Sequence, residues 1–223
     1  MKIIICNSKN WFRLNEHVLK NNDILLIPNK KSLSLEVVAK FEPDFIFFPH
    51  WNWIVEKEII DNFRCIAFHT APLPFGRGGS PIQNLISKGF KYTPVCALKM
   101  TKEIDGGPIY DKEEISLEGS LSEIFVRLNN ATNSIIERLI CNLPVPKEQT
   151  GKIFNFKRMS PEDNEILSNY SFEKIYDIIR MVDDPSYPCA YLNLEHVKIE
   201  FSEIEKDNDT LICNIRILNK GKS

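Results

Sequence analysis

Short apolar runs that alternate with helical segments are the feature that most constrains how this chain can fold. Strands are predicted over residues 2–6, 23–28, 45–50 and 65–70, and helices over residues 10–20, 32–41 and 56–63. Continuous apolar strands separated by helices are typical of a parallel sheet that is covered on both faces. We therefore expect an α/β, doubly wound (Rossmann-like) fold with a mostly parallel sheet.

The pattern changes after Pro144 and Pro146. Before them, the sequence predicts a helix that begins at Pro81, two strands, and a long helix whose start, Ser120 to Glu123, fits a capping box. After them it predicts one more helix and three strands of a small antiparallel unit. We expect a main domain over residues 1–150 and a C-terminal α+β extension over residues 151–223.

Charge and composition argue against several classes of partner. The 28 basic and 30 acidic residues give a net charge of −2, and no basic stripe stands out, so no nucleic acid is expected as a partner. No apolar run approaches the roughly 18 residues of a membrane span, and the run from Ile3 to Cys6 is too short for a signal peptide. A cytoplasmic protein without a membrane partner is expected. The spacing of the six cysteines favours buried, reduced thiols over a metal site.

A loop rich in proline and glycine follows the strand that ends at His69. Pro72 and Pro74 stiffen this loop, and Arg77 offers a planar fork for a carboxylate or phosphate. The glycines, which permit tight turns and the close approach of a ligand, are Gly76, Gly78 and Gly79. Because ligands of open α/β sheets bind beyond the carboxyl ends of strands, we interpret this stretch as a ligand-binding loop rather than a tight connection.

A second motif places a carboxylate after a later strand. Asp105 lies on a glycine-rich turn that follows the strand predicted over residues 93–100. A carboxylate beside an imidazole holds the ring in one orientation and favours its charged form. His69 and Asp105 are therefore candidates for a catalytic pair, although Asp105 taken alone is equally well explained as a turn residue.

The segments FHTAPLPFGRGGSP and IDGGPIY resemble the folate-dependent formyltransferases. Those enzymes share a histidine at a strand end, a proline-rich loop with an Arg-Gly step, and a later Asp-x-Gly turn; the pair of motifs is a far stronger signal than either alone. With FFPHWNWIV before it, the longer stretch is most similar to the nucleotide-sugar N-formyltransferases of the pseudaminic-acid pathway type, which are related to the formylation domains of peptide synthetases.

The resemblance implies N10-formyltetrahydrofolate as the donor, an amine as the acceptor and no metal. His69 is then expected to donate a hydrogen bond to the oxyanion, and Asp105 to keep His69 charged and accept the amine proton. The family's asparagine, two residues before the histidine, is replaced here by Ala67. The candidates to supply its amide are first Asn52, which we expect to be catalytic, and then Gln83 and Asn84.

The resemblance also implies the surroundings of the two substrates. The cofactor is expected against Phe48, His50, Trp51, Arg77, Gly78, Gly79, Met100, Ile104 and Gly106. The acceptor is expected against Thr70, Pro72, Phe75, Gly76, Arg77, Ser80 and Tyr110. Two of these residues have an equally good structural explanation: His50 as a cap at the end of a strand, and Trp51 as part of the core.

A nucleotide-linked amino-dideoxy sugar, formylated for glycan biosynthesis, is the acceptor that the resemblance implies. The alternatives are glycinamide ribonucleotide or another amine, a catalytically decayed protein that binds folate or a sugar nucleotide, and a hydrolase that releases formate. A homodimer is considered as the assembly state.

Overall fold

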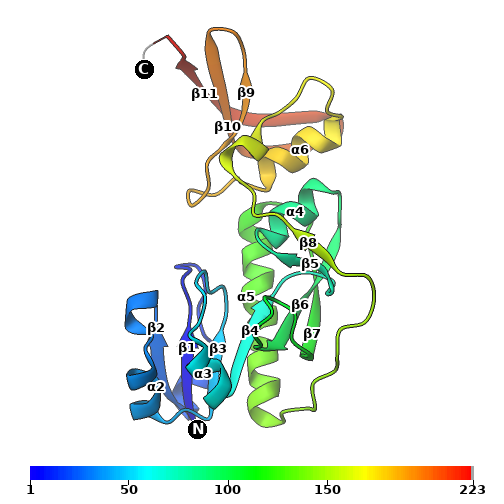
Figure 1. Cartoon of the computed structure of the whole chain (residues 1–223). Helices are drawn as coiled ribbons and strands as arrows, with labels where there is room; N and C mark the ends of the chain where they lie inside the picture. Colours follow the sequence, from blue (N-terminus) through cyan, green and yellow to red (C-terminus); the bar gives the residue numbers. More distant parts are fainter. Residues whose placement is uncertain (222–223) are drawn as a thin grey trace. The chain divides into compact units, whose positions relative to one another are not determined.

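Figure 1 shows the computed structural model of the chain, which describes residues 1–221. The backbone contacts divide it into two compact units. The first unit contains residues 1–78, 93–115 and 125–155, and the second contains residues 79–92, 116–124 and the chain from residue 156 onward. The domain boundary near residue 150 stays a prediction.

A six-stranded sheet forms the centre of the first unit, in the order β2-β1-β3-β4-β6-β7. The strands are β1 (Lys2–Cys6), β2 (Asp23–Ile27), β3 (Phe45–Phe48), β4 (Cys65–His69), β6 (Tyr92–Lys99) and β7 (Ile109–Ser116). Parallel ladders join β1 to β2, β1 to β3 and β3 to β4. The predicted mostly parallel α/β sheet is therefore confirmed.

The apolar core of this unit explains why its strands are continuous apolar runs. All four residues of β3 are buried, as are Ile4 and Cys6 of β1. A strand whose two faces are both covered has no polar face to present, so alternation disappears from its sequence. The helices and the short 3-10 turn of the first unit are α1 (Glu16–Asn21), η1 (Lys30–Ser32), α2 (Leu35–Phe41), α3 (Lys57–Asn62) and most of α5 (Leu121–Cys141).

The direction of β6 decides how the later part of the chain reaches the end of β4. β6 is antiparallel to β4, with His69 opposite Cys96 and Ile66 opposite Lys99. The backbone N–H of Met100 accordingly donates to the carbonyl of Cys65, at the beginning of β4. The carboxyl ends of these two neighbouring strands thus point in opposite directions. The chain after Lys99 must therefore fold back to approach His69.

The second unit contains α4 (Pro81–Ser87), η2 (Pro161–Asn164), α6 (Phe172–Arg180) and a three-stranded antiparallel sheet. Its strands are β9 (Ala190–Asn193), β10 (Val197–Asp207) and β11 (Thr210–Asn219), in the order β11-β10-β9. The C-terminal α+β extension predicted from the sequence is confirmed. A further pair of short strands joins β5 (Phe75–Gly78) to β8 (Phe154–Phe156). Within residues 1–221, no helix has both the length and the apolar character that crossing a membrane requires.

The first helix begins later than the sequence pattern indicates. A helix was expected from residue 10, whereas α1 begins at Glu16. The segment before it is held by side chains of α5: Asn133 accepts a hydrogen bond from the backbone N–H of Asn15 at 2.8 Å and donates to the carbonyl of Arg13 at 2.8 Å. Asn129 also accepts from the N–H of Arg13, so these backbone groups bond to α5 instead of to a helical turn.

The fully buried Asn133 provides a test of this arrangement. Replacing it by alanine leaves backbone groups of residues 13 and 15 without their partners, which typically costs about 1–3 kcal/mol. We expect the free energy of unfolding of Asn133→Ala, measured with urea, to fall by this amount. Asn129→Ala serves as the matched control. It removes a single hydrogen bond, which is more exposed, and should lower the free energy of unfolding less. An equal, small loss in both variants would contradict the bridging role of Asn133.

Candidate functional site

His69 is the last residue of β4, and its side chain is only 6% exposed. Its Nδ1 lies 3.3 Å from Oδ2 of Asp105, and its Nε2 lies 2.7 Å from the carbonyl oxygen of Gly76. Both ring nitrogens of His69 therefore face an oxygen acceptor. The pair that the sequence predicts for His69 and Asp105 is present in the structure.

Asp105 reaches His69 because the turn between β6 and β7 folds back along the sheet. The residue itself has a left-handed backbone, with φ of +52°, a conformation that aspartate tolerates better than most residues. Its Oδ2 also accepts a hydrogen bond from the N–H of Gly78 at 2.9 Å. A Cβ at Gly107 would lie 1.8 Å from the carbonyl oxygen of Lys99, so only glycine fits there.

Arg77 is buried at 6% exposure, and each of its three guanidinium nitrogens makes a hydrogen bond within the first unit. Its Nη1 lies 2.5 Å from Oε1 of Glu103, and its Nε and Nη2 donate to Oε1 of Gln149 at 3.0 and 2.8 Å. The fork that was expected to face a ligand instead joins β5 to the turn that carries Asp105. Direct binding of a substrate by Arg77 stays a prediction.

Glu103 and Gln149 are the members of this network that the sequence analysis missed. Gln149 lies 44 residues after Asp105, in the segment between α5 and β8. Its Nε2 donates to the carbonyls of Asp105 and Gly107, both at 2.8 Å. Nothing in the local sequence of either residue marks it, because each acquires its partner through long-range folding.

The turn after β3 lies beside the end of β4, since Phe48 is in register with Ala67. Phe48 itself is buried in the core, and Trp51 packs against the same core cluster, as do Ala67 and Met100. Asn52 is exposed and makes no hydrogen bond within residues 1–221. The structure thus puts Asn52 in the neighbouring turn without joining it to His69.

His50 occupies this turn in a left-handed conformation, with φ of +55°. Its ring packs against Trp11 at 4.4 Å and Phe12 at 5.7 Å between ring centres. Burial, together with the nearby positive charge of Lys9, lowers the pKa of His50 to about 3. Its Nε2 and the Nε1 of Trp51 are buried and find no hydrogen-bond partner in the described part of the chain.

Four of the remaining candidates belong to the second unit. The amide of Asn84 donates to the carbonyls of Gly79, Ser80 and Lys157, so it is committed to the backbone. Ser80, the N-cap residue of α4, has a φ of +50°, and its hydroxyl accepts a hydrogen bond from the N–H of Met159 and makes no capping bond to the helix. Gly79 leaves no room for a Cβ, which would lie 2.6 Å from Cβ of Arg158. Gln83 is buried in this unit.

Other expected contact residues lie in the first unit. Thr70 is buried, Pro72 and Gly106 are half-buried, and Ile104 is 67% exposed. Phe75 stacks on Phe154, with ring centres 5.0 Å apart. Tyr110 is half-buried on β7, and burial raises its pKa. The roles of these residues in binding a substrate stay predictions.

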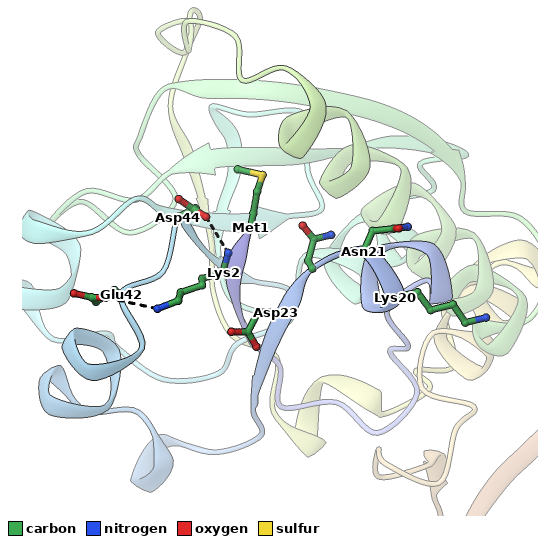
Figure 2. Close-up of a pocket in the computed structure, with 8 residues that line it drawn as sticks. Met1, Lys2, Lys20, Asn21, Asp23, Glu42 and Asp44 are labelled. Atoms are coloured by element: carbon green, nitrogen blue, oxygen red, sulfur yellow. Dashed lines mark hydrogen bonds and ion pairs between the residues drawn. The ribbon is translucent and has the colours of Figure 1, made fainter.

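A hollow in the first unit lies away from these residues. Figure 2 shows it at the amino ends of β1 and β2, where the backbone N–H of Lys2 donates to Asp44 and its ammonium lies 3.6 Å from Glu42. Because β1, β3 and β4 are parallel, this edge is opposite to the carboxyl end of β4 that carries His69. The hollow is therefore separate from the candidate site. No group of three or more metal-ligating side chains occurs within residues 1–221.

Residues 9–139 match the family described as formyl transferase, and residues 161–218 match the C-terminal domain of methionyl-tRNA formyltransferase. The solved structure of a methionyl-tRNA formyltransferase from Clostridium thermocellum is 40% identical, with a TM-score of 0.91, over 98% of this chain and 99% of that one. The methionyl-tRNA formyltransferase of Campylobacter lari is 29% identical over 90% of this chain and 73% of its own length. The chain spans 59–65% of the length of several other curated relatives that it matches.

These matches overturn the predicted acceptor. An N-formyltransferase from Helicobacter canadensis, solved with folinic acid and dTDP-3-aminofucose, is 15% identical to this chain, with a TM-score of 0.62 over 98% of each chain; that likeness concerns the fold alone. The relatives that are 29% and 40% identical to this chain are methionyl-tRNA formyltransferases. The prediction of a nucleotide-linked amino sugar as acceptor was therefore wrong, as was the prediction that no nucleic acid takes part.

The lowered pKa of His50 provides a test of its burial. Between its ordinary value of about 6.5 and the folded value of about 3, only the unfolded chain takes up this proton, so the fold loses stability as the pH falls. We expect the free energy of unfolding of the wild type to drop faster with acidification than that of His50→Asn, which tolerates the left-handed backbone. The difference is at most about 1.4 kcal/mol per pH unit. His196→Asn, at an exposed position, is the control; parallel curves for the wild type and His50→Asn would show that His50 titrates normally.

Proposed function

Because this chain belongs to the formyl transferase family, we propose that it transfers a formyl group from N10-formyltetrahydrofolate to the amino group of methionyl-tRNA. The prediction of a formyltransferase enzyme is confirmed by this membership, and so is the donor that the family uses. The observation that carries the chemical part of the proposal is the buried pair of His69 and Asp105. The methionyl-tRNA acceptor rests on the named relatives.

The donor supplies an activated formyl group. Over the whole reaction one C–N bond forms to the acceptor amine and the C–N bond to N10 breaks, while the amine loses a proton and N10 gains one. The chain must therefore hold the formyl oxygen, where negative charge develops, and provide a group that takes up a proton.

His69 is the group that we propose for the formyl oxygen. Asp105 holds its Nδ1, which leaves the Nε2–H as the donor on the other side of the ring. That N–H faces the carbonyl of Gly76, which orients it in the free protein, and the formyl oxygen would take the place of this acceptor. If this exchange occurs when the formyl donor binds, the N–H needs no further reorganisation as charge develops, which is why such groups contribute strongly to rate.

Asp105 is the group that we propose for the proton. Its Oδ2 is occupied by His69 and Gly78, whereas its Oδ1 makes no hydrogen bond within residues 1–221. The side chain is 18% exposed, so water and substrate can approach this second oxygen. Asp105 can therefore accept the amine proton through Oδ1 while Oδ2 continues to hold His69.

The turn after β3 fits a polar heterocycle. The Nε2 of His50 and the Nε1 of Trp51 are buried polar atoms whose hydrogen-bonding capacity is unused in the described chain, and groups of this kind commonly mark a place for a partner. We propose that this turn and the turn over residues 100–106 hold the pterin of the donor. The contacts expected for Phe48, Arg77, Gly78, Gly79 and the acceptor-side residues remain part of this proposal.

The proposal is tested by incubating the protein with N10-formyltetrahydrofolate and methionyl-tRNA, and measuring formylmethionine by mass after the ester is cleaved. We expect product with methionyl-tRNA and none with free methionine. His69→Ala should lower turnover about 100-fold or more while the protein stays folded, and His196→Ala should leave turnover unchanged. Formate released without an amine would point to a hydrolase, and retained activity in His69→Ala would remove His69 from the chemistry.

Asn52 is the candidate to replace the amide that Ala67 lacks. If its side chain helps to hold the formyl oxygen, the Asn52→Ala variant loses turnover while its affinity for the donor changes little. We expect kcat to fall about 10-fold or more and the Kd for tetrahydrofolate to change less than about 3-fold. Asn62→Ala, at an exposed position of α3, is the matched control. An unchanged kcat would exclude Asn52 from this role.

A further inference from the structure

The side-chain amide of Gln149 is saturated with hydrogen bonds to the groups that surround Asp105. Its Oε1 accepts from Nε and Nη2 of Arg77, and its Nε2 donates to the carbonyls of Asp105 and Gly107. An amide oxygen offers two acceptor positions and an amide nitrogen two protons, so all four are used. The orientation of the amide is unambiguous because Arg77 can only donate and the two carbonyls can only accept.

The chain holds Gln149 in place from both sides. Two residues earlier, Lys147 exchanges both backbone hydrogen bonds with Ile109, at 2.7 and 2.8 Å. Five residues later, the N–H of Phe154 donates to the carbonyl of Pro74 at 3.2 Å, and its ring stacks on Phe75. The segment between these anchors crosses the turn of Asp105, so the position of Gln149 does not depend on its own side-chain bonds.

The backbone of the turn is the part that Gln149 fixes. Asp105 keeps a left-handed conformation, with φ of +52°, which is uncommon for residues other than glycine even though aspartate tolerates it. The bonds of Gln149 go to the main-chain carbonyls of Asp105 and Gly107, whereas the carboxylate of Asp105 bonds to Gly78 and His69. Gln149 thus holds the turn without competing for the carboxylate.

The other tie to this turn is weaker. Arg77 pairs with the carboxylate of Glu103, whose side chain is 64% exposed. An ion pair with a partner open to water contributes little, typically below about 1 kcal/mol. The half-buried side chain of Gln149, which makes two hydrogen bonds to Arg77 and two to the turn, is therefore the main link between them.

We propose that Gln149 is a positioning residue for formyl transfer. By holding the main chain of Asp105 it keeps the carboxylate within reach of His69, and it does not itself touch the reacting atoms. This inference rests on the proposed function, in which Asp105 and His69 carry the chemistry. A misplacement of about 1 Å in such a pair can lower a rate about 100-fold.

Two substitutions separate the roles of the amide. Gln149→Leu keeps a similar volume and removes all four bonds, whereas Gln149→Glu keeps an acceptor for Arg77 and loses both donations to the turn. We expect kcat for formylmethionine formation to fall about 10- to 100-fold in both variants, with the KM for the donor changed less than about 3-fold. Glu148→Gln, at the exposed neighbouring position, should leave kcat unchanged. A normal kcat in Gln149→Glu would overturn the role of the two donated bonds.

A double-mutant cycle with Asp105→Asn distinguishes positioning from general stabilisation. If Gln149 acts through Asp105, the Gln149→Leu substitution should change the residual kcat of Asp105→Asn less than about 2-fold. Full additivity of the two losses would overturn the proposal, because it would mean that Gln149 acts independently of the carboxylate.

The nitrogen chemical shifts of the His69 ring provide a readout that needs no turnover. We expect Gln149→Leu to move the Nδ1 resonance in the same direction as Asp105→Asn, and Glu148→Gln to leave it in place. Unmoved resonances in Gln149→Leu would overturn the proposal. If the wild type forms no formylmethionine, the proposed function fails, and this measurement still decides whether Gln149 holds Asp105 against His69.

Discussion

The contact between Asp105 and His69 depends on a chain reversal that the sheet itself makes necessary. Because β6 runs antiparallel to β4, the residues after Lys99 emerge beside the beginning of β4, and Asp105 comes back toward His69 only through a tight turn. That turn requires a left-handed aspartate and a glycine at position 107 with no space for a Cβ. The geometry of the pair is thus inseparable from the strain of the turn that presents it.

The burial of Arg77 helps to hold this turn in place. A buried guanidinium must find acceptors for its donors, and here they are Gln149 and Glu103. The same bonds that satisfy Arg77 tie β5, the turn of Asp105 and the segment before β8 to one another. A rigid arrangement of this kind suits a site whose hydrogen-bond donors must be in place before negative charge develops on the substrate. Loss of Gln149 or Glu103 is therefore expected to have two separate effects. It lowers activity by displacing the carboxylate of Asp105, and it lowers stability by leaving the buried charge of Arg77 without a partner.

The sequence predicted those features of the fold and the site that depend on residues close together in the chain. Continuous apolar runs such as Phe45 to Phe48 identified the buried strands, and His69 and Asp105 stood out because each follows a strand in a stretch that cannot be regular structure. The partners of Arg77 could not be foreseen, since Gln149 reaches it across 72 residues of chain. The direction of β6 was hidden for the same reason: an apolar strand has the same periodicity whichever way it runs. The late start of α1 reflects Asn133, a competing partner that is 118 residues away from Asn15.

The acceptor was mispredicted because the residues that identify the reaction are not those that distinguish acceptors. We propose that His69 and Asp105 act on the formyl group, whose transfer is common to the whole family, so these residues indicate the chemistry and the formyl donor without naming the amine. The net charge of −2 does not decide the question either, because it averages over the whole surface, whereas a nucleic acid responds to the local arrangement of charge. Discrimination between acceptors must therefore reside in surfaces outside this pair, and a sequence signature confined to the pair carries no information about them.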